Sequence, residues 1–232
     1  EGKKLSKRDC VTSIDEFREM GYLPEALSNY MAFLGWSPKS ADREILSLEE
    51  ISEIFDLSEI NKAGAKFSWE KLNWINSQYI KNMESIKLSE IMRKYWDDNG
   101  WVPPSQEWAY KLAILLRDSM TLLKDSIDQS KPFFLIPTIQ KEGQDFLENR
   151  ESKLSLKLIL NYLIEQNTIK LNKEKAKEII NEISKKHNIK KGILMKSLRV
   201  AFFGSLSGPD LIQSWELFAE SKTDRTRIER CL

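Results

Sequence analysis

The stretch Lys4-Leu5-Ser6-Lys7-Arg8 carries the densest set of groups that could do chemistry. A lysine is a compact, mobile charge that can follow phosphates as negative charge builds on a leaving group. Ser6 adds a hydroxyl donor, and Arg8 can hold a phosphate or carboxylate with its planar fork. The stretch precedes a helix start, where Ser13 and Glu16 have the spacing of a capping box. Alone, such a stretch is more often a solvated basic tail.

The composition excludes several other kinds of site. The chain is 41% hydrophobic and 31% charged, which is enough apolar material for packed cores. Cys10 and Cys231 are interpreted as reduced thiols, and the single His187 cannot build a histidine metal site, so we predict none. No apolar run approaches about 18–20 residues, so we expect no membrane span. We expect a cytoplasmic protein, or an organellar one in a eukaryote.

The charge is balanced over the chain but uneven along it. The formal net charge is +1, yet residues 151–200 hold 12 Lys and Arg against 5 Asp and Glu, a net charge of +7. A local positive region suits a polyanion such as a nucleic acid. Lysine-rich helix faces are also commonly just solvated, so charge alone leaves both interpretations open.

Helical signals dominate the sequence. A second capping box begins at Ser47, Asp210 and Gln213 have the same spacing, and apolar residues follow at helical intervals. We therefore predict a mainly all-α fold. The apolar run 132–137 lies between two prolines and is predicted to be an extended connector. Turn residues divide the chain into three predicted units, 1–84, 85–137 and 138–232.

Several longer motifs follow the basic stretch in fixed order. They are G-Y-L-P-E-A-L-S-N-Y at 21–30, L-G-W-S at 34–37, F-S-W-E-K-L-N-W-I-N-S-Q-Y-I at 67–80, L-R-V-A at 198–201 and G-S-L-S-G-P-D-L at 204–211. This series resembles the bacterial and organellar glutamyl-tRNA synthetases, in which a KLSKR loop precedes a similar helix and turn. The resemblance covers essentially the whole chain and is strongest in 3–80 and 197–212.

The resemblance implies a fold and an activity. These class I ligases join glutamate to AMP with ATP and then transfer it to tRNA. Their nucleotide pocket lies in a Rossmann domain upstream of the KLSKR loop, so we expect a C-terminal fragment that is inactive alone. Residues 1–84 would include the stem-contact domain. The remainder would be a helical anticodon-binding region, an α-helix cage of two subdomains.

The resemblance also assigns roles to residues. Lys7 is the predicted catalytic residue, which would contact the ATP phosphates, with Mg²⁺ in the intact enzyme, and stabilise the pyrophosphate leaving group. Lys4 and Ser6 would help to bind ATP. Trp74 is either a core residue or a tRNA contact. The residues predicted to bind tRNA or the anticodon are Arg199, Gly208, Pro209, Leu211, Trp74 and Lys71.

Two departures from the family pattern matter, one for the geometry of the KLSKR loop and one for the choice of tRNA. Cys10 stands where the family has glycine, and a left-handed backbone there would cost about 1 kcal/mol. Ser119 lies near a position where some relatives carry an arginine that rejects tRNA-Gln.

We expect a monomer that binds tRNA-Glu, and tRNA-Gln stays open as a second partner. The alternatives are a stand-alone helical RNA-binding module without catalysis and a helical protein-interaction domain.

Overall fold

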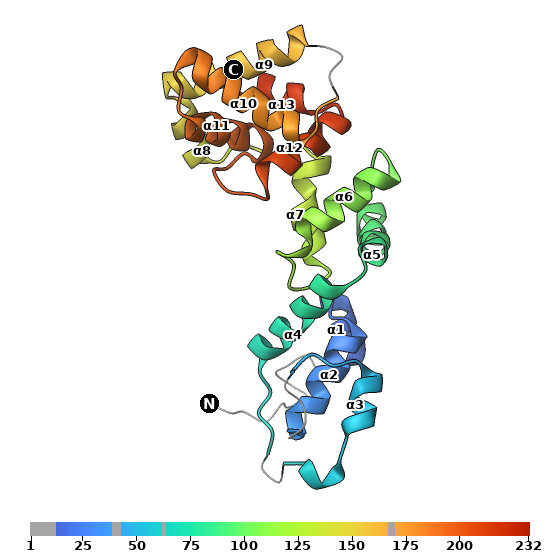
Figure 1. The fold of residues 1–232 in the computed structure, drawn as a ribbon. Helices are drawn as coiled ribbons and strands as arrows, with labels where there is room; N and C mark the ends of the chain where they lie inside the picture. Colours follow the sequence, from blue (N-terminus) through green and yellow to red (C-terminus); the bar gives the residue numbers. More distant parts are fainter. Residues whose placement is uncertain (1–12, 39–42, 62–63, 167–169) are drawn as a thin grey trace. The chain divides into compact units, whose positions relative to one another are not determined.

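The computed structural model describes residues 13–38, 43–61, 64–166 and 170–232 (Figure 1). Within these residues helices dominate, and the only pairing of extended segments is an isolated bridge between Trp36 and Ile60. The predicted all-α class is therefore confirmed. Lys4, Ser6, Lys7 and Cys10 lie outside the described residues.

The chain divides into two compact units. The first comprises residues 1–95 with 117–127, and the second comprises 96–116 with 128–232. The predicted division into 1–84, 85–137 and 138–232 stays a prediction.

Several helices of the first unit begin at residues whose side chains cap them. Both predicted capping boxes form: the Ser13 hydroxyl accepts from the Glu16 N–H, the Ser47 hydroxyl accepts from the Glu50 N–H, and each glutamate bonds back. These local bonds satisfy N–H groups that have no partner inside the helix. The helices of this unit are α1 (Ile14–Met20), α2 (Pro24–Gly35), α3 (Leu48–Ile54), the 3-10 helix η1 (Leu57–Glu59), α4 (Trp69–Asn82) and most of α5 (Ser85–Asp98).

Two buried asparagines join the elements of the first unit. Asn76 on α4 accepts from the Leu23 N–H at 2.8 Å and donates to the Thr121 carbonyl at 2.6 Å. Asn29 on α2 accepts from the Leu46 N–H at 3.1 Å and from the Tyr79 hydroxyl at 3.0 Å. Buried amide groups are stabilising when bonded in this way, because they then do not lose the bonds they had in water. The buried amide nitrogen of Asn29 has no such partner among the described residues. The bonded groups fix the packing of α2 against α4.

The second unit surrounds an aromatic core. Phe133 stacks on Phe218 with ring centroids 5.0 Å apart, and Phe202 lies 4.9 Å from the same ring. Such rings supply most of the buried apolar area of a small core. The helices of this unit are most of α6 (Gln106–Arg117) and of α7 (Asp125–Phe134), then α8 (Lys141–Leu147), α9 (Arg150–Glu165), α10 (Lys173–His187), α11 (Lys191–Phe203), α12 (Leu211–Glu220) and α13 (Asp224–Glu229).

A buried arginine on α13 links several parts of this core. Arg227 is 1% exposed and donates to the carbonyls of Phe202 at 3.0 Å and Leu135 at 3.3 Å. Its guanidinium carbon also lies 4.2 Å from the centre of the Phe218 ring, a cation–π contact. Burial, with repulsion from Arg230, lowers the pKa of Arg227 to about 10, so the side chain is charged at neutral pH.

The interpretation of 132–137 as an extended connector was wrong for its first three residues. Pro132 lies inside α7, which continues to Phe134. Inside a helix, proline cannot donate to the carbonyl four residues earlier, and its ring crowds that carbonyl, but only two residues of α7 follow Pro132. The Phe134 ring then packs 5.4 Å from Trp96 and 5.2 Å from Trp108. This aromatic packing favours the helical conformation.

We predict that Arg227→Ala destabilises the protein by about 3 kcal/mol, because it leaves buried carbonyls without donors. Urea unfolding followed by circular dichroism measures this. The control is Arg150→Ala on the exposed side of α9, for which we expect a change within about 0.5 kcal/mol. Equal effects of the two substitutions would contradict the role given to Arg227.

Candidate nucleic-acid interface

The turn between α11 and α12 brings the predicted anticodon residues of the second unit together. Gly208 has φ of +152°, and a Cβ there would lie 2.9 Å from the Phe203 ring. Only glycine fits this conformation without strain. Asp210 then caps α12, since its carboxylate accepts from the Gln213 N–H at 2.9 Å. The turn is thus fixed at both of its ends.

Arg199 projects from α11 onto this turn. Its Nη1 donates to the carbonyls of Gly208 at 2.7 Å and Pro209 at 2.9 Å. Within the described residues no hydrogen bond uses its Nε or Nη2, so this edge of the guanidinium has donors for a ligand. Burial lowers the pKa of Arg199 and the nearby Asp210 carboxylate opposes that shift.

The remaining two residues of the turn differ in exposure. Pro209 is half-buried, whereas Leu211 is only 2% exposed and belongs to the core of the second unit. The buried Leu211 side chain therefore supports the turn from within the core and is not exposed to solvent.

Trp74 and Lys71 lie on α4 of the first unit. Trp74 is 42% exposed. Of its two interpretations, a core residue or a tRNA contact, the first therefore does not apply. The Lys71 ammonium lies 4.3 Å from the centre of the Trp74 ring and also forms an ion pair with Glu44. The two side chains form one surface contact, in which the ammonium covers a face of the indole.

Sequence reasoning missed the rest of the exposed side of α11. Gly192, Met195 and Lys196 are exposed and precede Arg199 by seven, four and three residues. Residues at these intervals share one face of a helix. This spacing could be read from the sequence. Residues spaced three, four and seven apart, however, more often form the buried face of a helix than an exposed one.

The second unit, together with residues 87–95 and 117–127 of the first, matches a known family. Residues 87–232 fit the family model described as an anticodon binding domain. The chain belongs to this family of anticodon-binding domains. Residues 1–74, which precede the anticodon-binding domain, match the model described as tRNA synthetases class I (E and Q), catalytic domain.

Curated relatives extend the match over the whole chain. The chain is 96% identical over 232 residues to the glutamate–tRNA ligase of Prochlorococcus marinus strain AS9601. It is 48% identical to the ligase of strain NATL2A. In both cases the match covers 100% of this chain and 49% of the relative, so the chain spans about half the length of these ligases. The predicted resemblance to glutamyl-tRNA synthetases is confirmed.

Solved structures agree with the sequence relatives. A glutamate tRNA ligase from Elizabethkingia meningosepticum, crystallised in complex with its amino acid, has a TM-score of 0.88 at 31% identity. The match covers 100% of this chain and 49% of that chain. The enzyme from Elizabethkingia anophelis gives a TM-score of 0.82 at 32% identity, over 93% of this chain and 41% of that one.

The described part of the chain contains neither a grouped metal-ligand set nor a membrane-spanning helix. There, no three His, Cys, Asp or Glu side chains are grouped so that they could hold a metal ion. None of the described helices is both long and apolar enough to span a membrane.

We predict that Gly208→Ala destabilises the protein by about 1–3 kcal/mol, because the new Cβ meets the Phe203 ring in a backbone conformation that alanine avoids. Gly192→Ala is the control. Gly192 has an ordinary helical backbone and open space around it, so alanine there is expected to stabilise by about 0.5–1 kcal/mol. Thermal unfolding of both variants checks the pair, and the same sign for both would contradict the argument.

Proposed function

We propose that the chain is the tRNA-binding half of a glutamate–tRNA ligase, which activates glutamate with ATP and transfers it to tRNA in protein synthesis. The observation that carries the proposal is one chain matching both a class I (E and Q) catalytic model and an anticodon-binding model. The match to a glutamate–tRNA ligase, at 96% identity over the whole chain, supports it. The chain alone is expected to be inactive in charging.

The KLSKR loop is proposed to act on ATP. Lys4 and Ser6 would hold the loop against the nucleotide, and Lys7 would contact its phosphates together with Mg²⁺. As glutamate attacks the α-phosphate, negative charge moves to the departing pyrophosphate, where a positioned ammonium stabilises it most. The support for these roles is the motif and its place within the residues matched by the catalytic model.

The turn that holds Arg199 is proposed to read an anticodon base. Unstacked single-stranded bases are read through hydrogen bonds to their edges. Arg199 suits this role because two carbonyls fix its Nη1 and its other donors are not used by the described protein. Gly208 leaves room beside it, Pro209 offers a flat apolar edge, and the buried Leu211 holds the turn in place.

The contact between Lys71 and Trp74 is proposed as a second tRNA site, in the stem-contact region. An exposed indole can pack on ribose, and an ammonium can meet a phosphate. The Lys71 ammonium already forms an ion pair with the Glu44 carboxylate. A contact between Lys71 and a phosphate would therefore have to compete with that ion pair.

The partner is proposed to be tRNA-Glu, and Ser119 in place of a rejecting arginine leaves tRNA-Gln open as a second substrate. A monomer in the cytoplasm remains the expectation.

We predict that Lys7→Ala, in a full-length ligase that contains this chain, lowers ATP–pyrophosphate exchange by about 100-fold or more, because one charged contact to the leaving group is lost. The affinity for tRNA should change by less than about threefold. Near-normal exchange in this variant would sink the assignment of Lys7.

We predict that Arg199→Lys lowers discrimination between tRNA-Glu and tRNAs with other anticodons by about 5- to 150-fold, because lysine cannot reproduce the fixed fork. Filter binding of each tRNA to the chain measures this. Arg150→Lys on α9 is the matched control and should leave the discrimination unchanged. An unaltered ratio for Arg199→Lys would refute the base contact.

Charging of tRNA-Glu and tRNA-Gln by the full-length ligase tests substrate choice. We expect tRNA-Glu to be charged. Binding without charging of any tRNA would favour the stand-alone RNA-binding module instead.

A further inference from the structure

A cavity of about 490 Å³ lies in the second unit, beside the ends of α9 and α12 and the starts of α10 and α13. Cavities that bind small organic molecules have volumes of about 300–1,000 Å³ and combine an apolar wall with a few polar groups. Here Leu163, Leu171 and Ile179 form the apolar wall, and each is at most 8% exposed. The Arg199 turn does not line this cavity, so the proposed function leaves it unexplained.

The cavity contains a buried acid. Asp224 lines it and is 7% exposed, and none of the ion pairs between described residues includes this carboxylate. Burial raises the pKa of the Asp224 carboxyl, and neighbouring groups of Arg225 and Trp215 oppose that shift only in part. The Trp215 indole N–H has no partner at hydrogen-bond distance among the described residues. A carboxylate in such surroundings is costly, and a cationic ligand would stabilise it.

Exposed cations line the same cavity. Lys170 and Lys222 form no ion pair with a described carboxylate, whereas Lys111 of the same unit meets three. Arg225 adds a third positive charge, and its donation to the Leu163 carbonyl at 2.6 Å holds its guanidinium beside the end of α9. The cavity therefore offers positive groups for an anion as well as a buried acid for a cation.

The backbone of Lys222 gives an independent indication. Its φ is +58°, in the left-handed region, and Asn188 is the only other described residue besides glycines with a positive φ. The N–H groups of Lys222 and Thr223 bond the carbonyls of Ala219 and Phe218, an arrangement in which the left-handed residue is usually glycine. A cation is favourable at a helix end, but glycine would avoid the backbone strain. A ligand contact would explain why this position carries a lysine.

We propose that this cavity binds a free α-amino acid with a large apolar side chain. Asp224 accepts from the ammonium of the ligand, Lys170 and Lys222 hold its carboxylate, and the apolar wall packs on its side chain. The two opposite charges of one small molecule then match the two kinds of charge in the cavity, which a simple anion or a simple amine does not. This binding does not depend on the proposed function.

The test titrates the chain with three related molecules. L-phenylalanine carries both charges, phenethylamine lacks the carboxylate, and 3-phenylpropionate lacks the ammonium. Two-dimensional ¹H–¹⁵N spectra report both the affinity and the residues that respond. Phenylalanine is expected to bind with a Kd of about 1 mM or lower and to shift signals of 162–166 and 222–225. The two analogues should each bind at least about threefold more weakly, since each loses one charged contact.

Two substitutions separate the two charges. Asp224→Asn keeps the shape of the side chain and should weaken phenylalanine binding by about tenfold or more, while binding of 3-phenylpropionate stays as in the wild type. Lys222→Gly removes an exposed cation and should weaken phenylalanine binding by about two- to fivefold, with phenethylamine unaffected. The melting temperature of Lys222→Gly should rise by about 2–4 °C, because glycine suits the left-handed backbone. Weaker binding by a more stable protein cannot result from misfolding.

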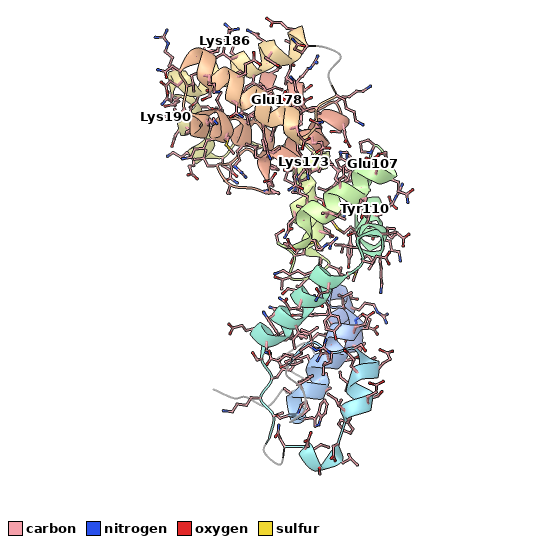
Figure 2. All side chains as sticks on the ribbon, in the orientation of Figure 1. Glu107, Tyr110, Lys173, Glu178, Lys186 and Lys190 are labelled. Carbon is pink, nitrogen blue, oxygen red and sulfur yellow. The ribbon has the colours of Figure 1, made fainter. Side chains whose placement is uncertain are left out.

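Asn188→Gly is the matched control. Asn188 has a φ of +52° and follows the end of α10, whereas Lys170 and the cavity lie toward the start of that helix. Figure 2 labels Lys173 at the start of α10 and Lys186 near its opposite end. The substitution replaces a left-handed residue with glycine without removing a charge, so phenylalanine binding should stay as in the wild type.

Three results would overturn the inference. One is the absence of saturable phenylalanine binding up to about 10 mM, ten times the expected limit. Another is an analogue that binds as tightly as phenylalanine, since the cavity would then not select a molecule with both charges. The third is phenylalanine binding that is unchanged in both Asp224→Asn and Lys222→Gly, which would place the bound molecule elsewhere on the chain.

Discussion

The buried guanidinium of Arg227 joins three parts of the second unit that are distant in sequence. It comes from α13, bonds the carbonyl of Phe202 on α11, bonds the carbonyl of Leu135 after α7, and stacks on Phe218 of α12. A charged side chain inside a core is costly unless its donors are satisfied and its face is covered, and both conditions are met. Because Phe202 lies in the last turn of α11, just before the turn to α12, the position of the Arg199 site depends on this network.

A cluster of ion pairs around Lys111 joins α6 to α12. Burial opposes the charge of Lys111, but the hydrogen bonds that its ammonium donates to Glu220, Glu216 and Glu107 raise its pKa. The Trp108 indole on the same helix donates to the Leu217 carbonyl at 2.9 Å. Charges in this part of the second unit are thus matched.

Local features of the sequence were predictable, and contacts between distant residues were not. The capping boxes at Ser13 and Ser47 follow from residues three positions apart, and both form. Pro132 was misjudged because the aromatic packing that favours its helix comes from Trp96 and Trp108, which a local pattern does not include. Arg227 gave no signal either, since its partner Leu135 lies 92 residues away.

The candidate site shows the same division. The motif brought attention to Arg199 and the turn, and the structure places them in contact. Burial could not be read from the motif, so Leu211 was grouped with residues that face solvent although it lies in the core. The opposite holds for Trp74, which has the helical spacing of a core residue yet is exposed.

The two carbonyls that hold Arg199 also affect how quickly an RNA complex would form and how long it would last. A free arginine side chain gives up about 2 kcal/mol of rotamer entropy when it is ordered. Here much of that ordering takes place during folding, since Nη1 is already bound to the turn. In the proposed complex, a base would meet a guanidinium that is already oriented, so less entropy would be lost on binding. The gain would appear mainly as a slower dissociation of the matched tRNA.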